Sequence, residues 1–149
     1  MKDLNSMKAG LAALAATALL WAAPANAQTH RTFIHIPFEF ATGNEVLPAG
    51  QYEVILNSQT AGVMLRNSND TAYHSVALSA RTGKRSTSDV SVAALKFDRY
   101  AGTMFLTAVW APGQEDGRIV RLSGKLAEAM RASLNENGSG SVTLNSGLK

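Results

Sequence analysis

The amino-acid sequence predicts an all-β domain, an antiparallel β-sandwich or small barrel of about seven strands with one C-terminal helix. Short segments in which apolar and polar residues alternate recur between clusters of turn residues from residue 31 to residue 122. Alternation with a period of two is the pattern of a half-buried strand. After Gly124 the composition changes to strong helix formers. Closely spaced strands followed by a single helix are therefore the arrangement that the pattern indicates.

The first predicted strand covers residues 31–40. Pro37 has no N–H to donate to a neighbouring strand, so this strand is expected at a sheet edge or with a bulge near its middle. Its inward face is expected to carry every second residue, namely Thr32, Ile34, Ile36, Phe38 and Phe40.

Residues 46–52 predict a hairpin with a three-residue loop. Pro48 suits the first corner of a type I turn, and Gly50 suits the left-handed position that closes such a loop. Further strands follow between turn residues, at residues 52–56, 61–66 and 73–80. The polar residues 81–89 are predicted to form the longest loop of the domain. Their basic run at residues 81–85 is more typical of a solvated loop than of a binding patch.

The C-terminal half predicts three more strands, at residues 90–97, 103–110 and 118–122, with a tight hairpin at Gly102. Residues 104–110 contain no charge, so we expect this strand to be buried on both faces and central in the sheet.

The predicted helix covers residues 125–134. Leu122, Leu126 and Met130 recur every four residues and form an apolar stripe that can close over the end of the sheet. Asn, Gly and Ser dominate residues 135–149, which are predicted to be a disordered polar tail.

Residues 1–27 have the pattern of a secretory signal peptide. Lys2 and Lys8 precede an apolar run at residues 9–23, and small residues occupy the cleavage site at residues 25–27. The alternative for the apolar run is a membrane anchor, but the run is shorter than the roughly 20 residues that span a membrane. No other segment approaches that length, so no transmembrane span is expected after cleavage. The sequence therefore predicts export to the periplasm or the extracellular space, with translation starting at Met1 or Met7 and a single domain over residues 28–134.

The composition of the predicted mature chain excludes several classes of partner and of protein. Without residues 1–27, the formal net charge of +3 falls to +2, because two Lys and one Asp are removed. This charge is too small to indicate nucleic-acid binding. The chain contains no cysteine, so it forms no disulfide. Gln28 stands where a bacterial lipoprotein needs Cys, which excludes that class.

The sequence predicts no catalytic, cofactor-binding or metal-binding residue. No serine lies in a G-x-S-x-G elbow. The acidic residues Glu39, Glu53 and Asp98 lie on separate predicted elements and are expected to be solvated surface carboxylates. His35 and His74 lie in strand contexts and could meet in space, but no third metal ligand is evident. We expect both to be strand-surface histidines.

Two binding alternatives remain open. Cleavage before Gln28 would place His30 third from a free amino terminus, where four nitrogens can form the square-planar set that Cu(II) and Ni(II) prefer. Cyclisation of Gln28 would remove the amine. Separately, Trp110, Tyr100 and Tyr52 could form an aromatic platform for a sugar or an apolar ligand, although core packing is the commoner role of such residues.

Four motifs occur in order at residues 37–40, 47–54, 97–100 and 105–110, which read PFEF, LPAGQYEV, FDRY and FLTAVW. As a set they resemble a family of short exported bacterial proteins that has no assigned activity. The resemblance implies an exported β domain and supplies no catalytic residue. We therefore expect a non-enzymatic interaction or structural component of the cell envelope, or a secreted one. The alternatives are a small-ligand or carbohydrate-binding module and, third, an exported hydrolase.

Overall fold

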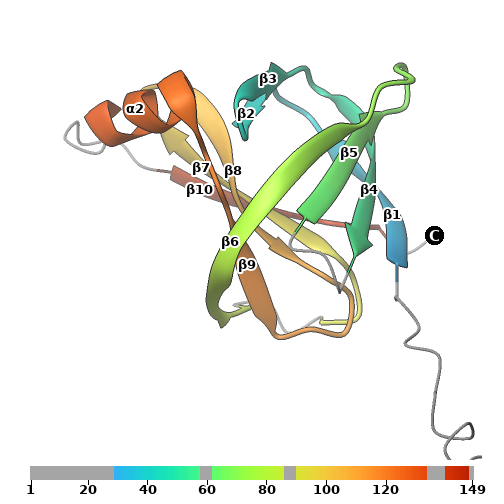
Figure 1. Ribbon diagram of the computed structural model, residues 1–149. Coiled ribbons are helices and arrows are strands. Elements are labelled where there is room, and N and C mark those ends of the chain that lie inside the picture. Colours follow the sequence, from blue (N-terminus) through green and yellow to red (C-terminus); the bar gives the residue numbers. More distant parts are fainter. Residues whose placement is uncertain (1–28, 58–61, 86–89, 134–139, 148–149) are drawn as a thin grey trace, which may run out of the picture.

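The computed structural model describes residues 29–57, 62–85, 90–133 and 140–147, which form ten strands and one helix (Figure 1). The all-β prediction is confirmed, with more strands than the seven expected. The elements are β1 (Thr29–Ile36), β2 (Phe40–Thr42), β3 (Glu45–Leu47), β4 (Gly50–Asn57), β5 (Gly62–Asn67), β6 (His74–Lys84), β7 (Ala94–Tyr100), β8 (Thr103–Trp110), β9 (Asp116–Val120), α2 (Gly124–Ser133) and β10 (Gly140–Asn145).

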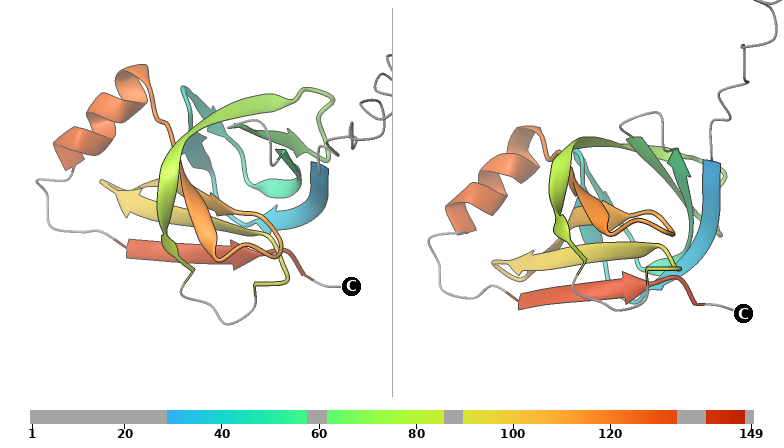
Figure 2. Two further views of the ribbon diagram at one scale, coloured as in Figure 1. Left: turned by 60° about the horizontal axis from the view of Figure 1, so that its bottom comes forward. Right: turned by 90° about the horizontal axis from the view of Figure 1, so that it is seen from below.

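One long strand, β6, joins the two halves of the sheet. Its first residues pair with β5 in a half ordered β1-β4-β5-β6, and residues from Leu78 to Lys84 pair with β9 in a half ordered β6-β9-β8-β7-β10. β2 pairs in parallel with β8, and β3 extends β2. β6 curves across between the halves (Figure 2). Among the described residues β1 and β10 do not pair with each other, so the sheet is not closed into a barrel.

The hydrophobic core lies between the two halves of the sheet. Phe40 and Tyr52 pack edge to face with a centroid distance of 5.4 Å, and Phe40 and Phe97 do so at 5.3 Å. All three rings are fully buried, and aromatic pairs in this geometry contribute beyond the area they bury. β8 is buried along most of its length, between β7 on one edge and β9 and β2 on the other. Its predicted central position is confirmed.

The first predicted strand is divided in two by Pro37. β1 ends at Ile36 and β2 begins at Phe40, and β1 pairs only with β4 among the described strands. The edge position that Pro37 predicts is therefore confirmed. The alternation is also confirmed, because Ile34 and Ile36 are buried whereas Phe33 is 55% exposed.

The predicted hairpin at Gly50 is wrong. β3 pairs with β2 rather than with β4, and Gly50 opens β4 opposite Ile36 without a left-handed backbone. Glycine leaves room here for the side chain of Asn67. A Cβ atom at this position would lie 2.7 Å from Nδ2 of Asn67, closer than real Cβ contacts.

In the C-terminal half, the structure confirms one predicted turn and corrects one predicted loop. Ala101 and Gly102 both have positive φ, as a tight two-residue hairpin requires. The loop predicted at residues 81–89 is wrong through Lys84, which belongs to β6, and residues 86–89 lie outside the described residues. The strand β6 continues there because it pairs with β9.

The predicted disordered tail is wrong for residues 140–145, which form β10. This strand pairs antiparallel with β7, and Leu144 packs against the core. Beyond it, the N–H of Ser146 donates to the carbonyl of Ala93 at 2.9 Å, and the N–H of Ala93 donates to Oγ of Ser146 at 3.1 Å. The domain therefore extends past the helix. The signal peptide predicted at residues 1–27 lies outside the described residues.

Candidate functional site

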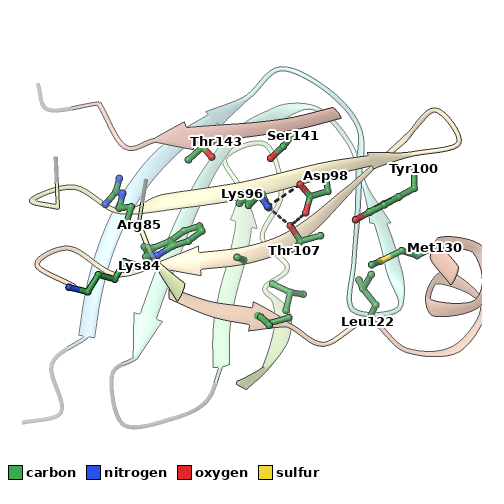
Figure 3. Close-up of a pocket in the computed structure, with 14 residues that line it drawn as sticks. Lys84, Arg85, Lys96, Asp98, Tyr100, Thr107, Leu122, Met130, Ser141 and Thr143 are labelled. Atoms are coloured by element: carbon green, nitrogen blue, oxygen red, sulfur yellow. Dashed lines mark hydrogen bonds and ion pairs between the residues drawn. The ribbon is translucent and has the colours of Figure 1, made fainter. Parts of the chain in front are cut away.

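A groove of about 600 Å³ crosses the outer face of the half formed by β10, β7, β8 and β9 (Figure 3). Lys96, Asp98 and Tyr100 alternate along β7 with the core residues Leu95 and Phe97, so their side chains lie on this outer face. β10 and β8 pair with β7 on its two sides and add side chains to the same face. The polar and small side chains contributed by those two strands are Ser141 and Thr143 from β10 and Thr107 and Ala108 from β8.

An ordered polar group lies in the middle of the groove. Nζ of Lys96 lies 3.3 Å from Oδ1 of Asp98, and the hydroxyl of Thr107 donates to Oδ2 of Asp98 at 2.7 Å (Figure 3). The register between β7 and β8 shifts at this point, because Lys96 pairs with Ala108 while Phe97 pairs with Leu106. Thr107 is thus the extra residue of a bulge, a feature that re-aims side chains.

Asp98 is not the solvated carboxylate that the sequence predicts. Its side chain is only 15% exposed, and both carboxylate oxygens have a partner within the groove. The cross-strand neighbour Thr107 and the same-face neighbour Lys96 shield it from solvent. The result is a fixed pattern of charge and hydrogen-bonding groups on the groove floor.

One end of the groove is apolar. Tyr100, Leu122 and Met130 lie together there (Figure 3), and the ring of Tyr100 packs on Phe105 at a centroid distance of 5.9 Å. Met130 comes from α2, which lies beside this half of the sheet (Figure 1). Of the predicted stripe, Leu122 packs against the core and Met130 lines the groove, whereas Leu126 is half-buried.

The structure separates the three aromatic residues proposed as a platform. Trp110 and Tyr100 line the groove, but Tyr52 is fully buried in the core. Trp110 is 6% exposed and packs with Ala94 and Ala108. Its indole N–H is buried without an acceptor among the described residues, which costs about 1–3 kcal/mol. The groove therefore has an aromatic wall but no flat exposed platform.

The pH dependence of the free energy of unfolding tests the burial of Tyr52 in the core. Burial raises the pKa of its phenol above 10.0, a hydrogen bond with Asn67 opposes that shift, and the charge of Asp70 adds to it. The folded state therefore holds the proton more tightly than the unfolded chain. The contribution to stability is complete below pH of about 10, and the free energy of unfolding falls as the pH rises through that value.

Urea unfolding between about pH 9 and about pH 11 measures this dependence. Tyr52→Phe is expected to flatten the slope of unfolding free energy against pH. The hydroxyl of Tyr52 donates to the carbonyl of Pro48 at 2.6 Å, so the variant is also less stable at every pH. An unchanged slope in Tyr52→Phe would contradict the assignment.

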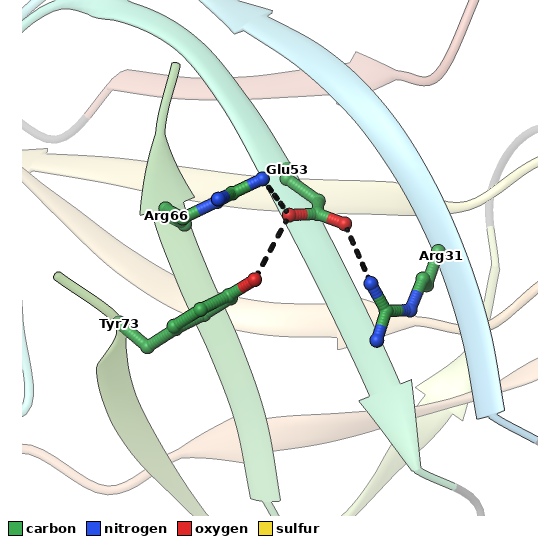
Figure 4. Close-up of polar contacts among 4 residues, drawn as sticks. All are labelled: Arg31, Glu53, Arg66 and Tyr73. Carbon is green, nitrogen blue, oxygen red and sulfur yellow. Dashed lines mark hydrogen bonds and ion pairs between the residues drawn. The ribbon is translucent and has the colours of Figure 1, made fainter. Parts of the chain in front are cut away.

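A second polar cluster lies on the outer face of the other half of the sheet. Glu53 on β4 binds Nη1 of Arg31 at 3.2 Å through Oε1 and Nη2 of Arg66 at 2.7 Å through Oε2 (Figure 4). The hydroxyl of Tyr73 donates to Oε2 at 3.4 Å, and the guanidinium of Arg66 lies 5.0 Å from the centroid of the Tyr73 ring. Glu53 is 5% exposed, so its predicted exposure is wrong. Side chains from both neighbouring strands cover it.

Exposed apolar side chains surround this cluster. Phe33 is 55% exposed, Met64 42% and Tyr73 46%. Together with Arg31 and Arg66 they form what we call the apolar-basic patch. It covers neighbouring positions of β1 and β5, with β4 between them, and includes Tyr73 just before β6.

The structure keeps the two predicted histidines apart. His35 lies on β1 and His74 on β6, with β4 and β5 between them. His74 instead places Nδ1 at 2.6 Å from Oε2 of Glu45. Glu39 is exposed between β1 and β2. Among the described residues no group of three or more His, Cys, Asp or Glu could hold a metal ion.

The amino-terminal copper or nickel site conflicts with β1. Thr29 and His30 already pair with Asn57 and Leu56. Successive amide nitrogens of a strand point to opposite sides, whereas the square-planar site needs both on one metal. The site would require β1 to unpair at its start, and Gln28 lies outside the described residues.

Comparison with protein-family models, with curated proteins and with solved structures gives no match to this chain. Within the described part of the chain, α2 is too short and too polar to cross a membrane. The groove and the apolar-basic patch are thus the features on which a functional assignment can be based.

Proposed function

We propose that the protein is an exported, non-enzymatic binding domain whose groove holds a small ligand. The groove itself carries this proposal. Its volume of about 600 Å³ falls within the range of small-molecule sites, which combine apolar walls with a few well-placed polar groups. Here the wall is Trp110, Tyr100 and Met130, and the polar group is Lys96, Asp98 and Thr107.

Export is supported by the sequence of residues 1–27. A basic start, an uncharged apolar run and small residues at the cleavage site are the features that secretion requires. The resemblance to exported bacterial proteins supports the same location, in the periplasm or outside the cell.

The groove chemistry favours binding over hydrolysis. General acid–base catalysis needs titratable groups that are available to the substrate. Asp98 is the one carboxylate among the described residues that line the groove, and both of its oxygens are engaged by Lys96 and Thr107. Those lining residues include no histidine that could activate Ser141 as a nucleophile.

Tryptophan fluorescence tests the proposal. The chain has two tryptophans, Trp21 and Trp110, so Trp110 is the single emitter in a Trp21→Phe chain whether or not the leader is removed. Titration with sugars, amino acids, fatty acids and alcohols is expected to give a saturable change in emission for one class. No change with any class would contradict the proposal.

A matched pair of variants on β10 shows whether binding occurs in the groove. Thr143→Tyr places a large side chain in the groove and is expected to weaken binding by about tenfold or more, because a filled pocket excludes its ligand. Val142→Tyr places the same side chain at the next residue, which points to the other face. It is expected to bind as the parent does, and equal effects of both variants would place binding elsewhere.

The apolar-basic patch favours a second candidate function, as an interaction component of the envelope. Phe33, Met64 and Tyr73 present three large exposed apolar side chains near two arginines, and exposed apolar clusters of this kind mark interaction sites. A native mass spectrum of the protein taken from its own cell envelope distinguishes the two functions. Added mass of a small molecule supports the groove, whereas a bound protein chain supports the patch.

A further inference from the structure

We propose that the ligand of the groove is an anionic amphiphile, a molecule with one acidic head and one alkyl chain. This inference rests on the proposed function of the groove and concerns the class of its ligand. It follows from the distribution of charge along the groove, which is basic at one end and apolar at the other (Figure 3).

The basic end is formed by Lys84 and Arg85, with Lys96 further along the groove (Figure 3). Three cationic side chains and one carboxylate, that of Asp98, are found among the described lining residues. With Glu115, which pairs with Lys84, these cationic side chains still outnumber the carboxylates by three to two, and the balance favours an anionic head.

Arg85 is held in place at this end. One guanidinium nitrogen donates to the carbonyl of Val92 at 2.6 Å, and the other donates to Oδ1 of Asn145 at 2.8 Å. Lys84 pairs with Glu115 at 3.2 Å, but both side chains are largely exposed. Exposed pairs of this kind contribute little, so an acidic head can replace Glu115 as the partner of Lys84.

The opposite end suits an alkyl chain. Tyr100, Leu122 and Met130 lie there (Figure 3), and methionine adapts to chains of varied shape. Lys96 and Tyr100 are four residues apart on β7, which corresponds to about 13 Å along a strand. The groove is therefore long enough to separate an acidic head from the end of its chain.

The same geometry disfavours a sugar. Sugar rings bind on the flat face of an exposed aromatic side chain, but Trp110 is 6% exposed and packed against Ala94 and Ala108. Tyr100 already packs on Phe105. Trp110 and Tyr100 are better placed as apolar walls beside the polar group of the groove floor than as a platform for a sugar.

Four probes test the inference in the full chain carrying Trp21→Phe: dodecanoate below its micelle concentration, dodecanol, butanoate and maltose. Dodecanoate is expected to change the emission of Trp110 and to bind about tenfold tighter than dodecanol, since a charge-assisted contact gives at least that factor. Butanoate, which has the head without the chain, is expected to bind at least about tenfold more weakly. Added salt weakens dodecanoate binding and leaves dodecanol binding unchanged.

Substitutions at each end of the groove test which end binds the acidic head and which binds the alkyl chain. Lys96→Gln is expected to weaken dodecanoate about tenfold without weakening dodecanol. Lys84→Gln is expected to weaken it by less, because the Lys84 side chain is 80% exposed, whereas Met130→Gln weakens both. Lys125→Gln, an exposed change on α2 outside the groove, is the matched control. Equal binding of dodecanoate and dodecanol, or dodecanoate binding that Thr143→Tyr does not weaken, overturns the inference. If the protein binds maltose but not dodecanoate, the inference is overturned and the groove remains a ligand site. If the protein binds no probe of any class, the proposed function itself is contradicted.

Discussion

Glu53→Gln is expected to lower the free energy of unfolding by about 2–3 kcal/mol, because the change leaves two arginines beside a buried amide in place of their shared carboxylate. Glu53 is 5% exposed and binds both Arg31 and Arg66. Removing one partner of a buried ion pair costs more than the pair itself contributes, since the remaining charge stays desolvated. The side chains of Arg31 and Arg66 are 64% and 36% exposed and both recover some hydration, which keeps the loss below the largest values.

Urea unfolding at neutral pH measures this loss, and Glu115→Gln is the matched control. Glu115 pairs with Lys84 at 3.2 Å, as Glu53 pairs with Arg31, but both partners are exposed. The control is expected to change the free energy of unfolding by at most about 1 kcal/mol. Equal losses in the two variants would show that the buried position of Glu53 has no special energetic role.

The position of Glu53 shows where sequence reasoning reaches its limit. Alternation correctly places Tyr52 and Val54 in the core and Glu53 on the other face of β4. An outward position on a strand normally predicts exposure. Burial of Glu53 depends on Arg31 and Arg66, which reach it from two different strands. The alternation of one strand contains no information about such cross-strand neighbours.

The sequence alone does not predict the groove, for a related reason. Alternation of Lys96, Asp98 and Tyr100 with core residues could have shown that they share a face. The bulge that adds Thr107 to that face depends on the register between β7 and β8, and register is a tertiary property. By contrast, β8 was predicted with its observed bounds, because an uncharged run beside a tight hairpin is a local signal.

β10 was missed because its composition resembles that of a disordered segment. Gly, Ser and Asn surround Val142 and Leu144, and the strand exposes most of its residues. A strand that pairs with one neighbour and covers little core can form without a run of apolar residues. The alternation of Val142 and Leu144 was the available signal, and the free edge of β7 supplies the rest.

Removing β10 tests whether this strand is part of the folded domain, and a large loss of stability is expected. A chain ending at residue 139 is expected to lose about 2–4 kcal/mol of unfolding free energy, since six ladder positions and the burial of Leu144 disappear. It also exposes the edge of β7, where unpaired strands promote aggregation. Loss of Ser141 and Thr143 from the groove should weaken ligand binding in the same variant.

A chain ending at residue 147 is the control, and it is expected to match the full chain in urea unfolding because β10 and Ser146 remain. Hydrogen exchange in the full chain gives an independent measurement, since amides of β7 that pair with β10 should be protected and should lose protection in the shorter chain. A disordered tail predicts the opposite on both counts, with the same stability for both truncations and no protected amide between residues 140 and 145. The two measurements therefore decide whether the C-terminal strand is part of the folded domain and of the wall of its groove.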